Sequence, residues 1–366
     1  MLSALAGDRA RVADLEARIL DLEHSLAALR LEKWAAQERL DSYKYPVLTL
    51  PNELVSEIFI YFLPIYPVCP PLTGILSPIC LTHICRKWRD IGLATPALWR
   101  AMSLSGNHNT FDWLEMWLGR SGCCPLSIRM DEWEDGDIPL VSELIAVVLL
   151  HRARLEHLQI RLFGPLPAIE TRLPLLSHLD LEFDNFPNGP IGITFHEDDV
   201  PLLRTVTLDV IASRNVVLPW AQLTSLTLRQ VDIDSCVPIL RKATNLVYCQ
   251  LDLEYDDEES HQCPDIILPK LQTLCCNDED YSGPTSTYLY AFVVPALRSL
   301  HVAERFLRPD RISSLSSFIS KSGCKLQDVR ITGRRIVREE TYRKAFPLIQ
   351  NFSFDGAYVG NEGWGD

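Results

Sequence analysis

Cysteine and histidine are the residues whose types and spacing come closest to a chemical site in this chain. The segment Cys80-Leu81-Thr82-His83-Ile84-Cys85 offers two thiols and one imidazole within a short stretch. Zinc requires a tetrahedral set of ligands that converge on one point. Helix positions i, i+3 and i+5 do not converge well, and a fourth ligand is missing. We therefore expect no metal site here.

Other motifs of catalysis are missing from the sequence. Cys123-Cys124 and Cys275-Cys276 are adjacent pairs, and adjacent side chains of a strand point to opposite faces. The sequence has no C-x-x-C pair, no glycine-rich phosphate-binding loop and no G-x-S-x-G nucleophile elbow. A cysteine–histidine pair that forms only in space is left open. We expect no enzyme activity, no cofactor and no metal.

Charged residues gather in separate parts of the chain. Acidic residues crowd positions 132–137, 197–199, 252–259 and 278–280. These segments predict solvated loops or, alternatively, a surface for a basic target. Basic residues crowd the last repeats, where we expect a preference for an acidic or phosphorylated target segment, because arginine pairs bidentately with phosphate. The arginines assigned to target binding are Arg330, Arg334, Arg335 and Arg338.

The composition limits which partners and which cellular compartment we expect for this protein. The formal net charge of −13 opposes a general nucleic-acid or anionic-membrane surface, because phosphates would be repelled. Charges recur from Asp8 onward, so no secretory leader is expected, and no run of 18 apolar residues predicts a membrane span. Eleven cysteines, an odd number, fit reduced thiols. We expect a cytoplasmic or nuclear protein, or both.

Residues 1–45 carry a heptad pattern that predicts one long helix. Arg11 stands five residues before Glu16, and Arg18 stands five before Glu23, the spacing of interchain pairs in a parallel two-stranded coiled coil. Two interpretations stay open: a homodimer through this helix, or an amphipathic helix that packs on its own domain. The heptad positions are Leu5, Val12, Ile19, Leu26 and Leu40 in one series and Leu15, Leu22 and Leu29 in the other.

Residues 46–104 predict a small helical unit. Pro51 suits the first turn of a helix, and the apolar face of that helix follows. Five prolines between Pro64 and Pro78 predict a loop of about fifteen residues. A second helix is expected from about Pro78 to Gly92, and a short turn from Thr95 to Trp99 closes the unit.

Residues 105–366 repeat one pattern: an apolar residue, two variable residues, an apolar residue, one variable residue and an apolar residue. Intervals of 20 to 29 residues separate nine copies, which is the range of leucine-rich repeats. The pattern predicts an irregular solenoid in which each short strand buries its apolar face against its neighbours. Unrelated strands of an α/β domain are the alternative, and residues 105–150 are a candidate cap. The copies begin at residues 155, 176, 203, 223, 246, 271, 297, 326 and 349.

The second unit resembles the F-box, a helical module that docks a target-binding protein onto a Skp-type adaptor. The matching motifs occur in the family's order: Leu50-Pro51-Asn52-Glu53, Ile58-Phe59, Cys85-Arg86-Lys87-Trp88 and Leu98-Trp99. With the leucine-rich helix before it and the repeats behind it, the chain resembles the expanded F-box family of mushroom-forming fungi. The resemblance implies an α+β repeat fold made of a coiled coil, a three-helix F-box-like module and a leucine-rich-repeat solenoid.

The resemblance also implies partners and a docking surface. The chain would recruit a Skp-family adaptor and a cullin ubiquitin ligase and would present an unidentified protein target. A non-ligase interaction scaffold is the alternative. The proline-rich insert from Pro64 to Pro78 departs from the family pattern and lengthens the link between the first two helices. The residues carried over as adaptor-binding are Leu50, Pro51, Leu54, Ile58, Phe59, Leu63, Trp88, Leu98 and Trp99.

Overall fold

The computed structural model describes residues 2–43, 46–105, 110–131, 138–163, 169, 171–184, 193–253, 264–278, 288–356 and 358. The chain divides into two compact units, Met1–Ile58 and Phe59–Asp366. The first unit contains helix α1 (Leu2–Ser42), the 3₁₀ helix η1 (Pro46–Thr49) and the start of helix α2 (Asn52–Phe62). The expected long N-terminal helix is confirmed, and its sequence of strong helix formers contains no proline.

The segment 78–93 forms two helices where the sequence predicted one. They are α3 (Pro78–Ile84) and α4 (Arg86–Leu93), followed by the 3₁₀ helix η2 (Pro96–Trp99). The prediction of a single helix was wrong because Cys85 adopts an extended backbone, with φ −156° and ψ 168°. Its sulfur accepts a hydrogen bond from the Trp88 amide at 3.5 Å, so Cys85 caps the second helix.

The second unit is built on one large parallel sheet. Eleven strands pair in chain order, and every pairing is parallel. All nine predicted copies supply strands of this sheet. The strands are β1 (Ala101–Leu104), β2 (Leu126–Met130), β3 (Leu155–Phe163), β4 (His178–Asp184), β5 (Thr205–Leu208), β6 (Ser225–Val231), β7 (Tyr248–Leu253), β9 (Thr273–Asp278), β11 (Ser299–Ala303), β12 (Asp328–Thr332) and β13 (Asn351–Phe354).

The apolar positions of the copies form the core. Leu158, Leu179, Val206 and Leu226 are aligned across successive strands, and each is buried. Cys249 and Cys276 occupy leucine positions and are also buried, because a free thiol packs like a small apolar group. Since each strand buries the same face, no strand is stable without its neighbours.

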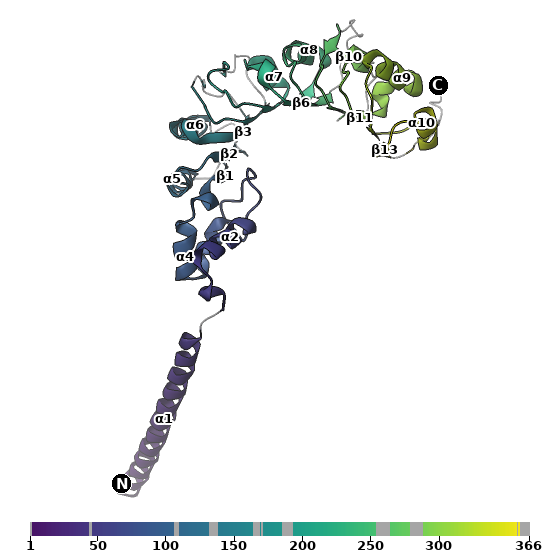
Figure 1. The fold of residues 1–366 in the computed structure, drawn as a ribbon. Helices are drawn as coiled ribbons and strands as arrows, with labels where there is room; N and C mark the ends of the chain where they lie inside the picture. Colours follow the sequence, from purple (N-terminus) through teal and green to yellow (C-terminus); the bar gives the residue numbers. More distant parts are fainter. Residues whose placement is uncertain are drawn as a thin grey trace. The chain divides into compact units, whose positions relative to one another are not determined.

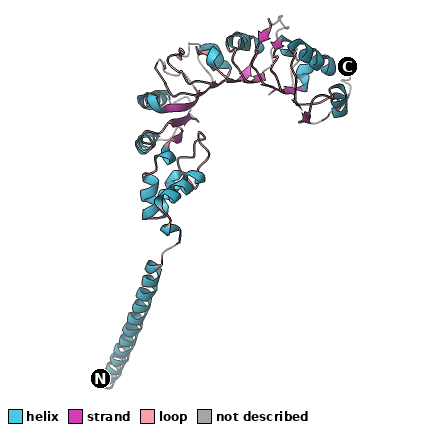
Figure 2. Cartoon of the chain, in the orientation of Figure 1, coloured by secondary structure: helices cyan, strands magenta, loops and turns pink. Residues whose placement is uncertain are grey.

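Helices return the chain between strands and cover one face of the sheet (Figures 1 and 2). A minor sheet of two short strands, β8 (Ile266–Ile267) and β10 (Phe292–Val293), lies apart from the main one. The remaining helices are α5 (Thr110–Arg120), α6 (Ile138–Leu150), α7 (Val210–Asn215), α8 (Ile233–Lys242), α9 (Arg311–Ser322) and α10 (Glu339–Ala345), with 3₁₀ turns η4 (Arg152–Arg154), η5 (Trp220–Gln222), η6 (Tyr288–Ala291) and η7 (Glu304–Leu307).

The sheet begins before the first clear repeat. β1 pairs with β2, and β2 pairs with β3, so the sheet includes residues 101–104, within the predicted 46–104 unit. None of the described helices is long and apolar enough to cross a membrane.

Candidate interaction surfaces

Helix α2 carries a stripe of exposed apolar side chains. Leu54 is 52% exposed, Ile58 is 49% exposed and Tyr61 is 85% exposed. Together with Phe62, they follow spacings of three and four residues, which places them on one helical face. Val55 and Phe59, on the adjoining face of α2, are buried. These four large apolar side chains form an exposed apolar stripe on one helix.

The residues carried over from the resemblance divide between surface and core. Pro51, Leu54 and Ile58 are exposed, whereas Leu50, Leu63 and Trp88 are half-buried. Phe59, Leu98 and Trp99 are buried and pack inside the unit. This difference arises because a motif records residue identity and leaves open which face of the helix each side chain occupies.

Aromatic contacts hold the helical segments of the second unit together. Phe59 meets Trp88 edge to face with ring centroids 5.0 Å apart. The indole nitrogen of Trp99 donates to the Gly92 carbonyl oxygen at 2.9 Å, and its ring meets Trp117 of α5 edge to face at 5.4 Å. Such pairs stabilise a core beyond the burial of their area. Trp99 therefore joins the helical segments to the beginning of the sheet.

The proline-rich insert packs against the sheet. The Tyr66 hydroxyl donates to Glu156 at 2.7 Å, and the Tyr66 ring meets His157 edge to face at 5.3 Å. The guanidinium of Arg100 lies 4.0 Å from the Tyr66 ring centroid. Burial, followed by the bond to Glu156, raises the pKa of Tyr66. The Ser127 hydroxyl also donates to the Pro67 carbonyl oxygen at 2.7 Å, so the insert is held at β2 and β3.

The helix-free face of the sheet is polar. One position of each main strand, between the two apolar positions, is aligned across the whole sheet, and we call this set the open-face row. Since strand side chains alternate between faces, the open-face row points away from the apolar core. The row consists of Ser103, Arg129, Gln159, Asp180, Thr207, Thr227, Gln250, Cys275, His301, Arg330 and Ser353.

A cluster of charges lies beside the middle of the open-face row. Arg229 reaches Glu182 at 2.8 Å and Asp180 at 3.4 Å. Arg161 approaches Glu182 at 3.1 Å. Burial raises the pKa of Asp180, and the cations Arg229 and Arg161 oppose that rise. This cluster was not predicted from the sequence, although its charged residues lie between or directly after the apolar positions of the copies.

One cysteine–histidine pair does form in space. The Cys275 sulfur lies 3.5 Å from Nδ1 of His301 on the neighbouring strand. Burial raises the pKa of the Cys275 thiol and lowers the pKa of the His301 imidazole. Both shifts favour the neutral forms of these two groups, and a neutral thiol is a weaker nucleophile than a thiolate. Within the described residues, no group of three or more histidine, cysteine or acidic side chains is arranged to hold a metal ion.

The arginines expected to bind the target are partly engaged by the chain itself. Arg330 pairs with Asp355. Arg335 is buried, pairs with Glu339 at 2.9 Å and donates to the Gly356 carbonyl oxygen at 3.1 Å. Arg334 and Arg338 are exposed, and Nε of Arg338 donates to Tyr358 at 3.4 Å. The structure thus places two of the four guanidinium groups in internal ion pairs.

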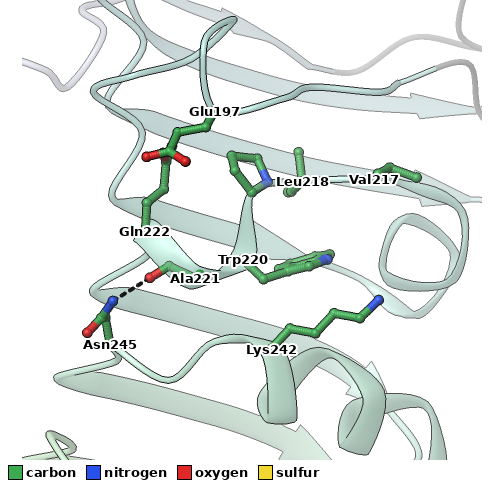
Figure 3. Close-up of a pocket in the computed structure, with 9 residues that line it drawn as sticks. Glu197, Val217, Leu218, Trp220, Ala221, Gln222, Lys242 and Asn245 are labelled. Carbon is green, nitrogen blue, oxygen red and sulfur yellow. Dashed lines mark hydrogen bonds between the residues drawn. The ribbon is translucent and has the colours of Figure 1, made fainter.

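A pocket lies beside η5, the short helix that precedes strand β6. It has a volume of about 560 Å³ and contains Trp220 between Leu218 and Lys242 (Figure 3). Glu197, from the acidic segment 197–199, also lines the pocket.

The other predicted acidic segments lie mostly outside the described residues, at 132–137, 254–259 and 279–280. Asp252 is buried and bonds to Gln250 and Asn277, so it contributes to the sheet rather than to a loop.

No known protein-family model matches this chain, and no curated protein matches it.

Proposed function

We propose that this chain is the target-recognition adaptor of a Skp–cullin–F-box-type ubiquitin ligase. In this proposal, residues 46–104 act as an F-box-like module that docks a Skp-family adaptor. The observation that carries the proposal is the exposed stripe of α2, which follows the Leu50-Pro51 motif and includes Leu54 and Ile58. An interface with an apolar centre would cover these side chains and exclude water from them.

The repeats support a target-binding role. In this proposal, the eleven-stranded parallel sheet is a leucine-rich-repeat-like solenoid that buries its apolar rows and binds the target along its open-face row. A long row of polar side chains on a rigid sheet is suited to hydrogen-bonding with an extended protein surface. The proposal assigns adaptor docking to α2 and target binding to the open-face row, leaving no reaction chemistry to the chain itself.

Co-purification of the full-length chain with a Skp-family adaptor tests the docking surface. The variant Leu54→Glu/Ile58→Glu places two charges on the exposed stripe, and we expect at least about a 100-fold loss of adaptor affinity. The control Leu202→Glu/Leu348→Glu adds the same charges at other exposed leucines, which are 47% and 91% exposed. The control should retain the adaptor. Full retention by the stripe variant would refute this docking surface.

A second function has one observation in its favour. Phe59, Leu98 and Trp99 belong to the adaptor-binding motif, yet they are used inside the unit. A scaffold whose helical unit only packs internally would use them in the same way. Such a scaffold binds its target through the open-face row and leaves the Skp-family adaptor unbound, so the same co-purification separates the two functions.

A further inference from the structure

Helix α1 exposes a continuous apolar seam. Val12 is 53% exposed, Leu15 is 45%, Ile19 is 55% and Leu22 is 69%. Leu26 and Leu29 continue the seam with exposures of 48% and 62%. A lone helix with such a seam leaves several large apolar side chains in water, and burying them against a partner would be favourable. The seam is therefore an unpartnered surface.

The residue types in the seam favour a coiled coil of two helices. In heptad notation, Val12 and Ile19 occupy a positions, whereas Leu15 and Leu22 occupy d positions. β-Branched residues at a with leucine at d favour a parallel dimer over higher oligomers. Lys33 falls at the next a position after Leu26, and a single polar a residue fixes the register of the two chains.

The charges beside the seam favour a second copy in parallel orientation. Arg11 and Arg18 occupy g positions, and Glu16 and Glu23 occupy e positions. In a parallel pair, each g residue faces the e residue five positions later in the partner, so every one of these contacts joins arginine to glutamate. In an antiparallel pair, g faces g and e faces e, which brings like charges together. All four side chains are exposed, and no bond within the described chain engages them.

We infer that α1 forms a parallel two-stranded coiled coil with a second copy of this chain. The apolar seam 12–29 supplies the buried layers, and the arginine–glutamate pairs set the orientation. The inference rests on α1 alone, so it holds whether the proposed ligase function is right or wrong. A dimer carries two solenoid faces and therefore gains avidity for a target with repeated binding sites.

Sedimentation equilibrium of the full-length chain tests the dimer. We expect a dimer at about 10 µM, with dissociation in the micromolar range or below. The variant Ile19→Asp/Leu22→Asp buries four charges per dimer, so dimer affinity should fall at least about 100-fold. The control Leu20→Asp/Leu31→Asp adds the same charges at residues that are 53% and 69% exposed but lie outside the seam. The control should remain dimeric.

Energy transfer between dyes tests whether the two helices are parallel. Donor and acceptor dyes on the N-terminal amines of mixed chains should show high energy transfer in a parallel dimer. In an antiparallel dimer, the 41-residue helix would hold the dyes about 60 Å apart. Chains with Arg11→Glu/Arg18→Glu and chains with Glu16→Arg/Glu23→Arg should each dimerise about tenfold more weakly, and their mixture should recover.

Three outcomes would overturn the inference. The first is a wild-type chain that stays monomeric at about 100 µM, roughly 100 times a micromolar dissociation constant. The second is a dimer that survives the seam variant, since a different surface would then join the chains. The third is a dimer with low energy transfer between its N-termini, which contradicts the parallel orientation.

Discussion

The Tyr66 hydroxyl donates a 2.7 Å hydrogen bond to Glu156, although ninety residues separate the two in the chain. Tyr66 belongs to the proline-rich insert, and Glu156 belongs to β3. The sequence presented the insert as a long connection between helices. In the structure, the insert connects the helical segments after Phe59 with the first strands of the sheet. It packs against residues of β2 and β3.

We expect Tyr66→Phe to loosen the insert. The substitution keeps the ring against His157 and below Arg100 but removes the hydroxyl that Glu156 accepts. The net loss of one such bond is about 1 kcal/mol, which corresponds to roughly fivefold faster opening. Hydrogen exchange of the backbone amides of residues 63–76 measures this opening.

The matched control is Tyr61→Phe. Tyr61 is 85% exposed, so loss of its hydroxyl should leave hydrogen exchange unchanged. Tyr66→Ala removes the ring contacts as well and should accelerate exchange further than Tyr66→Phe. Equal exchange in all three variants would show that the bond does not hold the insert.

The neighbouring histidines predict a pH dependence. Burial, followed by the charge of His178, lowers the pKa of His157 from 6.5 to about 4. Between these values the unfolded chain binds a proton that the folded chain does not, so stability falls as pH falls through this range. After allowance for solvent screening of a half-exposed group, we expect His157 to contribute about 1 kcal/mol of destabilisation between pH 7 and 5.

Urea unfolding of wild type and His157→Gln at both pH values measures the histidine contribution. The variant cannot bind the proton, so its loss of stability on acidification should be smaller than that of wild type by about 1 kcal/mol. His196→Gln serves as the control because His196 is exposed. Identical pH dependence in all three proteins would contradict the assignment.

The sequence was sufficient to predict the strands because the repeat itself encodes burial. Leu179, Val206 and Leu226 recur at the same place in successive copies, and aligning those places yields the observed register. Periodicity identifies which side chains are inside, and the residues between them must then face out. The open-face row was therefore predictable in principle, although its charge pairs were not.

Contacts between distant segments were beyond the sequence. Nothing local to Tyr66 indicates Glu156, and nothing local to Arg335 indicates the carbonyl of Gly356. The helix break at Cys85 was also not predicted from the sequence, because isoleucine, cysteine and arginine around it are all compatible with a continuous helix. The burial of Trp99 followed from its packing on Trp117, which lies in a segment outside the F-box-like motif.

Substitution of Glu304 should strongly reduce the stability of the C-terminal part of the sheet. This carboxylate is 1% exposed and accepts hydrogen bonds from the amides of Ile336 and Val337, at 2.5 and 3.2 Å, and from the Tyr342 hydroxyl at 3.1 Å. Glu304→Ala leaves three donors without this acceptor, so we expect a loss of about 3 kcal/mol in the free energy of unfolding. Chemical denaturation measures the loss.

Glu304→Gln separates charge from hydrogen bonding. Its amide oxygen still accepts bonds from the same side, so it should recover part of the loss. Glu340→Ala is the control, because Glu340 is exposed on α10 of the same terminal region. A Glu304→Ala variant within about 0.5 kcal/mol of wild type would mean that the carboxylate does not organise residues 336–342.

The cysteines in the apolar rows should behave as apolar groups. Burial raises the pKa of Cys249 well above its usual value and raises the pKa of Cys276 to about 12, so both thiols stay protonated at pH 8. Alkylation of the folded chain should therefore reach the exposed Cys123 first, and both buried thiols only after unfolding. Cys249→Ser buries a hydroxyl and should cost about 2 kcal/mol, whereas Cys123→Ser should cost almost nothing. Rapid alkylation of Cys249 in the folded chain would contradict its place in the core.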